Sequence, residues 1–249
     1  MEARGVSPNA VSFGAAISAC KPRGLWEKAL ALLEEATLRG LEPDVIAYSS
    51  AISVCETAGQ WERAVSLLYE MPGRGLQPNV YSFSSAISAC EKAGQSDRAL
   101  LLFQEMLSRG VEPDEISYAT AISACGRGGK SQQALELLKD MQERGLAPSM
   151  ITFSAAITAC AKGEEWERAL QLLDELCSRG LEPNVIVYSA AITACQRGGQ
   201  WERALTLLDE MQTRGVEPNV ITFSAAISAC QKGGQRERAL LLLPAMQLR

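Results

Sequence analysis

The sequence predicts an all-α fold, a right-handed α-α superhelix (α-solenoid) of helix-turn-helix repeats. Three observations predict it. First, seven cysteines recur every 35 residues along the 249-residue chain, and such a period is typical of solenoids. Second, a nearly constant sequence segment ends at each cysteine, for example SFSSAISAC or TFSAAISAC. Third, each period contains two apolar segments with helical spacing. The seven cysteines are Cys20, Cys55, Cys90, Cys125, Cys160, Cys195 and Cys230.

The repeats are delimited by the Pro-Asn or Pro-Asp pair that ends most of them. Counting from the residue after that pair predicts repeats 10–44, 45–79, 80–114, 115–149, 150–184 and 185–219, followed by an incomplete seventh repeat, 220–249. Residues 1–9 align with residues 211–219. They are therefore expected to be the tail of a preceding repeat, and the chain a segment of a longer array.

Within each repeat the order of the elements follows from local signals. The first segment carries Ala and Ile at helical spacing and contains the cysteine. A turn such as Gly198-Gly199 follows, since glycine supplies the left-handed residue that closes a helix. The second segment, such as WERALTLLDEM, has an apolar stripe and ends in Arg-Gly, as at Arg39-Gly40. Pro72 is expected to shorten the second helix of its repeat.

The composition excludes several partners. The net charge is −5, which gives no general attraction to nucleic acid or anionic lipid, so a nucleic-acid site must depend on local charge. No apolar run approaches the roughly 18 residues of a membrane span, and we expect no membrane partner. The sequence has no histidine, the commonest general base and metal ligand. Near-identical repeats also offer no pocket of diverse residues, no GxSxG and no phosphate loop, so no enzyme is expected.

The repeated cysteines are expected to pack. Equivalent residues on stacked helices lie roughly 8–10 Å apart, whereas a disulfide needs Cα atoms within about 7 Å. No Cys-x-x-Cys pair suggests zinc. We therefore expect no metal, no cofactor and a reducing compartment. The eighth cysteine, Cys177, lies in a charged stretch. One slot at the start of the second segment holds all four tryptophans, where packing is favoured over base stacking: Trp26, Trp61, Trp166 and Trp201.

The repeat resembles the pentatricopeptide repeat. Each unit is 35 residues long, carries Tyr or Phe followed mostly by Ser near its start, and typically ends in Gly-[Leu/Val]-x-Pro-[Asn/Asp]. The related tetratricopeptide repeat has 34 residues and a different aromatic pattern. The uniform length resembles the pure, P-type class of the family. The resemblance covers essentially the whole chain. It implies sequence-specific binding of single-stranded RNA, about one base per repeat, in mitochondrial or chloroplast RNA processing, stability or translation.

The resemblance also implies which residues contact the RNA. The fifth and last residues of a unit recognise the base, and the second residue flanks it. By analogy with the family code, Ser–Asn suggests adenine and Ser–Asp guanine, so the RNA is predicted to be N-A-G-N-A-A-N, 5′ to 3′. The fifth and last residues form the pairs Gly14 with Asp44, Ser49 with Asn79, Ser84 with Asp114, Ala119 with Ser149, Ser154 with Asn184 and Ser189 with Asn219, while Ser224 has no partner; the second residues are Val11, Ile46, Tyr81, Ile116, Ile151, Ile186 and Ile221.

The chemistry of the pairs agrees with this code. An amide such as Asn79 can donate to a ring nitrogen of adenine, whereas a carboxylate such as Asp114 only accepts and favours a base edge with N–H groups. Gly14 and Ala119 offer no side-chain hydrogen bond, so their repeats should discriminate poorly. An alternative interpretation needs no RNA. Asn or Asp before a helix is a favourable N-cap, worth typically about 1 kcal/mol, and serines allow close helix packing.

Charged residues also recur at fixed positions of the repeat. A basic position, the basic slot, lies at the end of the first segment. In the family this position approaches the RNA phosphates, and phosphate contacts position the strand without specifying its sequence. An acidic slot on the second segment is expected to concentrate negative charge on the outer face. A salt-bridged, solvated surface is the alternative for both. The rival function is a TPR-like protein-protein interaction scaffold, since concave solenoid surfaces also bind peptides. The basic slot is Lys92, Arg127, Lys162, Arg197 and Lys232, and the acidic slot is Glu35, Glu70, Glu105, Asp140, Glu175 and Glu210.

Overall fold

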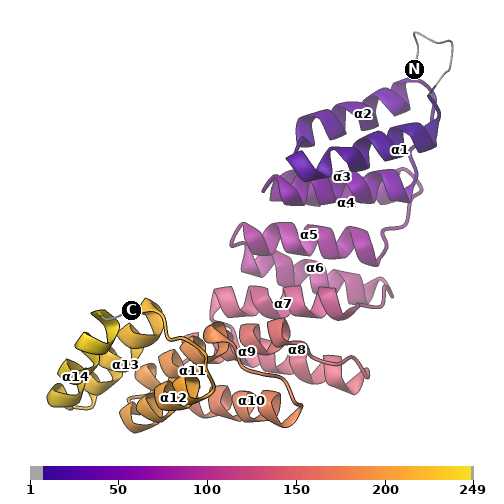
Figure 1. The fold of residues 1–249 in the computed structure, drawn as a ribbon. Helices are drawn as coiled ribbons and strands as arrows, with labels where there is room; N and C mark the ends of the chain where they lie inside the picture. Colours follow the sequence, from indigo (N-terminus) through magenta and orange to yellow (C-terminus); the bar gives the residue numbers. More distant parts are fainter. Residues whose placement is uncertain (1–7, 248–249) are drawn as a thin grey trace. The chain divides into compact units, whose positions relative to one another are not determined.

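In the computed structural model of the protein, the backbone is described for residues 8–247 and the side chains for residues 8–243. This part of the chain forms fourteen α-helices and one 3-10 helix, with no strand (Figure 1). The first helices of the repeats are α1 (Ala10–Ala19), α3 (Val45–Thr57), α5 (Val80–Lys92), α7 (Glu115–Gly128), α9 (Met150–Lys162), α11 (Val185–Arg197) and α13 (Val220–Lys232). The second helices are α2 (Trp26–Leu38), α4 (Trp61–Gly73), α6 (Ser96–Ser108), α8 (Ser131–Glu143), α10 (Trp166–Ser178), α12 (Trp201–Thr213) and α14 (Arg236–Gln247), and the 3-10 helix η2 is Lys21–Arg23.

The prediction of an all-α array of helix pairs is therefore confirmed. The handedness of the superhelix stays a prediction. Most of the predicted tail of a preceding repeat, residues 1–9, lies outside the described residues, as do the last two residues of the predicted incomplete repeat 220–249.

The helices form two compact units, residues 1–124 and 125–249, and the division falls inside α7. In the first unit, α1, α3 and α5 contact one another in succession, and each packs on the second helix of its own repeat. In the second unit, α9, α11 and α13 repeat the same arrangement. Within each unit, the middle first helix, α3 or α11, is thus flanked by a first helix on each side, so its small residues must accommodate close neighbours on two sides.

The helix ends follow from local sequence. At the start of α5, Asn79 Oδ1 accepts from the backbone N–H of Ser82 at 3.0 Å, and Ser82 Oγ accepts from the backbone N–H of Asn79 at 2.8 Å. This reciprocal capping box satisfies two of the N–H groups that a helix start leaves unpaired. At the end of α6, Gly110 has φ +71°, and its N–H donates to Leu107 O at 3.0 Å. Such a left-handed residue closes a helix at low cost only when it is glycine.

The expectation that Pro72 shortens its helix is wrong. The helix α4 has 13 residues, as does α6, and it continues to Gly73. Proline lacks only the N–H group, and its carbonyl still accepts from Gly75 N at 3.0 Å. Since Pro72 lies in the last turn, α4 loses one hydrogen bond without losing its closing turn.

The core consists of the small residues of the first helices and the Leu and Met residues of the second helices. In α5, for example, Ala86, Ile87 and Cys90 are fully buried. All seven cysteines of the 35-residue series are buried and free, which confirms the packing prediction. Trp166 is half-buried and lies against Gly198 of the next repeat, as the packing interpretation expects. Among residues 8–247, no helix is long and apolar enough to cross a membrane.

Candidate RNA-binding surface

The last residue of each repeat precedes the next first helix, and its side chain is exposed. In five of these residues the Oδ1 atom caps that helix: it accepts from Ala47 N (2.8 Å) at Asp44, Ser82 N (3.0 Å) at Asn79, Ser117 N (2.8 Å) at Asp114, Val187 N (3.1 Å) at Asn184 and Thr222 N (2.9 Å) at Asn219. The N-cap interpretation is therefore correct for these five residues.

Capping does not exclude base recognition, because it uses only one end of the side chain. When Oδ1 accepts from the backbone, an asparagine keeps its Nδ2 amino group as a donor, and an aspartate keeps Oδ2 as an acceptor. Asn219 can thus present a donor and Asp114 an acceptor from the same position of the repeat. Because the cap uses Oδ1, the end of the side chain that remains available is a donor in Asn and an acceptor in Asp.

The fifth residues are less accessible than the last residues. Ser49, Ser84 and Ser189 are buried in the first-helix layer. Gly14, Ala119 and Ser154 are half-buried, and Ser224 is exposed. Close helix packing, the alternative role for these serines, is therefore part of what they do.

The structure nevertheless brings the fifth and last residues together in two repeats. Ser84 Oγ lies 2.7 Å from Ser117 Oγ, and Ser117 Oγ donates to Asp114 Oδ1 at 2.6 Å. Likewise Ser189 Oγ lies 2.8 Å from Thr222 Oγ1, which donates to Asn219 Oδ1 at 2.9 Å. The connecting residue is in each case the third residue of the next repeat.

Sequence reasoning missed this third position. Four of its five hydroxyl-bearing members, Ser82, Ser117, Thr152 and Thr222, are fully buried, and the fifth, Ser12, is half-buried. The signal was present, because Ser or Thr recurs three residues after the capping residue, where capping boxes place their second polar side chain. The third residues are Ser12, Ala47, Ser82, Ser117, Thr152, Val187 and Thr222.

Ala119 and Ser149, the predicted recognition pair of the fourth repeat, lie in different units. Ala119 is half-buried in α7. Ser149 precedes α9 without capping it, and its Oγ lies 3.2 Å from Thr152 Oγ1. This repeat therefore lacks an amide or carboxylate at its last position.

The second residue of every repeat has an exposed side chain with a large apolar surface. Their exposed fractions are 77% for Val11, 69% for Ile46, 49% for Tyr81, 66% for Ile116, 69% for Ile151, 60% for Ile186 and 64% for Ile221. Each lies in the first turn of a first helix, two residues after the preceding last residue. Single exposed apolar residues need no explanation, but one at the same place in every repeat indicates a binding surface.

The basic slot lies at the C-terminal ends of the first helices, and all five cations are exposed. Lys162 Nζ donates to Arg127 O at 2.9 Å, and Arg197 Nη1 donates to Lys162 O at 3.2 Å. Lys92 forms an ion pair with Glu56 at 2.9 Å. Cations near a helix C-terminus stabilise it, so at least part of the repetition is structural. Ammonium and guanidinium groups have further donors, and a phosphate role stays a prediction.

The expectation of a concentrated acidic outer face is wrong. Each carboxylate of the acidic slot is paired with an arginine four residues later: Glu35–Arg39, Glu70–Arg74, Glu105–Arg109, Asp140–Arg144, Glu175–Arg179 and Glu210–Arg214. The salt-bridged alternative is confirmed for this slot. The guanidinium of Arg109 also lies 5.9 Å from the ring centroid of Phe83. Burial and the neighbouring Glu70 carboxylate raise the pKa of Tyr48 to about 12.

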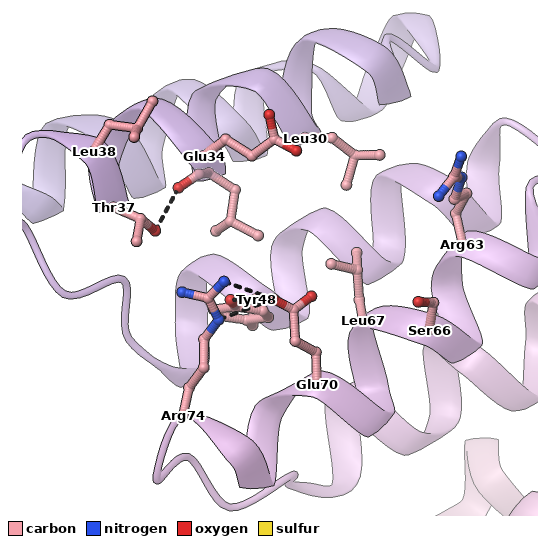
Figure 2. A pocket seen from close by; sticks show the side chains of 11 residues that line it. Leu30, Glu34, Thr37, Leu38, Tyr48, Arg63, Ser66, Leu67, Glu70 and Arg74 are labelled. Atoms are coloured by element: carbon pink, nitrogen blue, oxygen red, sulfur yellow. Dashed lines mark hydrogen bonds and ion pairs between the residues drawn. The ribbon is translucent and has the colours of Figure 1, made fainter.

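A groove lies on the second-helix side, between α2 and α4 (Figure 2). Its volume is about 360 Å³; Leu30 and Leu67 contribute apolar surface, and the Glu70–Arg74 ion pair lies at one side. An equivalent groove of about 450 Å³ lies between α10 and α12. No group of three or more Cys, Asp or Glu residues that could hold a metal ion occurs in the described part of the chain.

Known structures share this fold. The chain is 28% identical to the pentatricopeptide repeat protein PPR10, solved in complex with an 18-nt psaJ RNA element, with a TM-score of 0.59 over 98% of this chain and 34% of that chain. The chain thus spans about a third of the length of PPR10. It also resembles nuclear proteinaceous RNase P 2 from A. thaliana, with a TM-score of 0.64 at 15% identity over 73% of this chain and 41% of that chain. Among curated proteins, none matches the sequence significantly.

Family comparisons cover the repeats themselves. The pentatricopeptide repeat domain matches residues 101–163 and 171–233, about half of the chain. The PPR repeat family matches residues 43–92, and the PPR repeat matches residues 11–41, 81–111 and 151–181. The resemblance that the 35-residue units suggested is thereby confirmed. The chain belongs to the pentatricopeptide repeat family.

Proposed function

We propose that the chain binds single-stranded RNA sequence-specifically, with about one base per repeat. The observation that carries this proposal is that each repeat has an exposed apolar second residue two positions after the exposed last residue of the preceding repeat. An apolar side chain can flank the face of any base, whereas a capping Asn or Asp can recognise its edge. The similarity to PPR10, whose structure contains an RNA element, supports the proposal.

The family further suggests what the RNA binding serves. We propose a role in RNA processing, stability or translation in a mitochondrion or chloroplast, and binding without catalysis. The uniform 35-residue repeats favour the P-type class. The predicted RNA remains N-A-G-N-A-A-N, with the best-supported bases at the second, third, fifth and sixth repeats.

The base preference can be measured directly with fluorescently labelled RNA. Oligonucleotides with the predicted bases should bind more tightly than those in which adenine and guanine are exchanged at the second, third, fifth and sixth positions. Selection from a randomised RNA pool should return the same pattern. A pyrimidine-rich or featureless selected pool would overturn the proposal.

A substitution at Asn219 gives a sharper test. Asn219→Asp retains the Oδ1 cap on α13 but replaces the outward donor with an acceptor. We expect the preference at the sixth base to change from adenine to guanine by about ten-fold or more, the effect of a good pair of hydrogen bonds to a base. Asn9→Asp is the matched control, since Asn9 caps α1 in the same way but belongs to no complete recognition pair. It should leave the sixth base unaffected.

A TPR-like protein-binding scaffold is the second candidate function, and one observation favours it. The groove between α2 and α4 recurs between α10 and α12, on the second-helix side of the repeats. A peptide bound there would be insensitive to Asn219→Asp. RNA binding, by contrast, should weaken as salt rises, because each phosphate contact contributes about −0.7 to the slope of log affinity against log salt.

A further inference from the structure

In the sixth repeat, a third polar side chain connects the two residues of the predicted recognition pair, Ser189 and Asn219. Thr222, the third residue of the next repeat, is fully buried between Ser189 and Asn219. Its Oγ1 lies 2.8 Å from Ser189 Oγ and 2.9 Å from Asn219 Oδ1, and it accepts from the backbone N–H of Asn219 at 3.3 Å. We call this arrangement of fifth, third and last residues the hydroxyl relay.

The number of protons in the relay determines which group donates. A threonine hydroxyl has one proton and two lone pairs. Asn219 Oδ1 can only accept, and it already accepts from Thr222 N, so the Thr222 proton is directed to that oxygen. One lone pair of Thr222 accepts from Asn219 N. The remaining lone pair faces Ser189, and Ser189 must therefore donate its own proton to Thr222.

The third repeat contains the same relay. Ser117 is fully buried, its Oγ donates to Asp114 Oδ1 at 2.6 Å, and it accepts from Asp114 N at 3.4 Å. A distance of 2.6 Å is typical of a hydroxyl donating to a carboxylate. Ser84 Oγ, 2.7 Å away, must then donate to Ser117. In both repeats the proton of the fifth-residue serine is committed, so its hydroxyl has only acceptor capacity left.

We propose that in the third and sixth repeats the third residue of the following repeat, Ser117 or Thr222, is a positioning residue for base selection, because it makes the fifth-residue serine a hydrogen-bond acceptor. This inference rests on the proposed RNA binding. The second repeat does not form the relay, since Ser49 Oγ is buried and bonds to no described residue although Ser82 occupies the third position.

In the sixth repeat, Asn219 Nδ2 would donate and Ser189 Oγ would accept, which complements the N1 acceptor and N6 amino donor of adenine. In the third repeat, Asp114 Oδ2 and Ser84 Oγ would both accept, which complements the N1–H and N2 amino groups of guanine. Ser84 and Ser189 each keep 8% of the residue surface exposed.

The fifth repeat provides an internal comparison. It has the same pair, Ser154 and Asn184, but its third-position residue is Val187, which is fully buried and has no hydroxyl. Asn184 Oδ1 accepts instead from two backbone groups, Ile186 N at 3.0 Å and Val187 N at 3.1 Å. Without a relay, the Ser154 hydroxyl can rotate to donate or to accept. The fifth base should therefore be selected less strictly than the sixth, although the two recognition pairs are identical.

Two reciprocal substitutions test the proposal. Thr222→Val should reduce discrimination of adenine over guanine at the sixth base by about five-fold, the effect of one ordinary hydrogen bond. Val187→Thr should increase discrimination at the fifth base by a similar factor. Thr222→Ser keeps a hydroxyl and should preserve discrimination. Ser12→Ala is the control for a lost capping contact. Ser12 Oγ donates to Asn9 Oδ1 at 2.9 Å, and Asn9 belongs to none of the recognition pairs defined above.

A measurement without RNA separates failure of the relay from failure of the proposed function. In the free protein, NMR should detect hydroxyl protons of both Ser189 and Thr222 that exchange slowly with water, and Thr222→Val should remove the protection at Ser189. Rapid exchange of the Ser189 hydroxyl in the wild-type protein would overturn the relay, whether or not RNA binds. Unchanged discrimination at the sixth base in a folded Thr222→Val variant would overturn its role in selection. If the wild-type protein shows no base preference at all, the role in selection is refuted together with the proposed function, while the relay is still judged by exchange.

Discussion

At the scale of single residues, the last position of the repeat combines two properties in one side chain. Asn79 caps α5 through Oδ1, and its amino group remains available to a ligand. The sequence suggested the cap and the recognition role as alternatives, because a capping signal and a base-recognition signal consist of the same residue types. The structure shows that the cap orients the side chain, so the two interpretations are compatible.

The cysteines permit a prediction at this scale. Burial raises the pKa of the Cys90 thiol to about 11 and that of the Cys160 thiol to about 12, so neither forms an appreciable thiolate near neutral pH. Burial also raises the pKa of the Cys177 thiol, but this side chain is half-exposed and therefore accessible to a reagent. In the folded protein at pH 8, a thiol reagent such as DTNB should therefore modify Cys177 rapidly and the seven cysteines of the 35-residue series only on unfolding.

The control is Cys177→Ser, which should lose the rapid phase and keep the slow one. Rapid modification of more than one thiol per folded chain would contradict the burial of the repeat cysteines.

At the scale of elements, the spacing between first helices depends on small residues. Gly126 in α7 lies so close to α9 that an added Cβ would be 2.9 Å from the carbonyl oxygen of Ala155. The corresponding position of other repeats carries larger residues, such as Gln196. The helices α7 and α9 therefore approach more closely at this point than a side chain would allow, and backbone atoms cannot yield as a flexible side chain could.

Two glycine-to-alanine substitutions test this packing. Gly126→Ala should lower the free energy of unfolding by about 1 kcal/mol, since overpacking outweighs the gain in helix propensity. Gly14→Ala is the matched substitution in α1, where an added Cβ meets nothing within 4 Å. It should raise the free energy of unfolding by about 0.5–1 kcal/mol. Urea denaturation measures both, and equal stabilisation by the two substitutions would contradict the close approach.

At the scale of the whole molecule, repetition makes small local effects accumulate. Each repeat contacts its neighbours, so stability is approximately a sum over repeats and their interfaces. The buried cysteines are one such accumulated effect. Burial raises the pKa of Cys55, Cys90 and Cys195 to about 11 and that of Cys125 and Cys160 to about 12, from an ordinary value of 9.0.

The free energy of unfolding should therefore fall as the pH rises from about 9 to 11. Above pH 9 the unfolded chain loses thiol protons that the folded chain retains, so the unfolded state binds fewer protons and is favoured by rising pH. Below pH 9 this contribution is fully present. Urea denaturation at pH 8, 9, 10 and 11 measures the effect. The double variant Cys90→Ala, Cys195→Ala should lose less stability over this range, and an unchanged pH dependence would contradict the assignment to the thiols.

Much of the fold was predictable because its signals are local and repeated. The 35-residue period, the apolar spacing and the Arg-Gly stops each depend on residues within one repeat. Averaging over seven copies makes such signals hard to mistake. Pro72 was misjudged because its effect depends on which turn of the helix it occupies, and the sequence placed that turn only approximately.

The candidate site was predictable in part. The sequence and its family resemblance indicated the second, fifth and last residues, but not their accessibility. Only the tertiary structure revealed that five of the last residues are exposed caps, that Ser84 and Ser189 are mostly buried, and that the acidic slot is paired with arginines.

By itself, the sequence determined that this protein is an all-α array of 35-residue repeats and which positions vary between them. The tertiary structure alone decided how those positions meet. Ser189 and Asn219 are 30 residues apart in the chain, yet Thr222 joins them, because stacking places the first helix of one repeat beside that of the next. Hydrogen bonds between repeats depend on distances across a packed interface, and a period along the chain does not contain those distances.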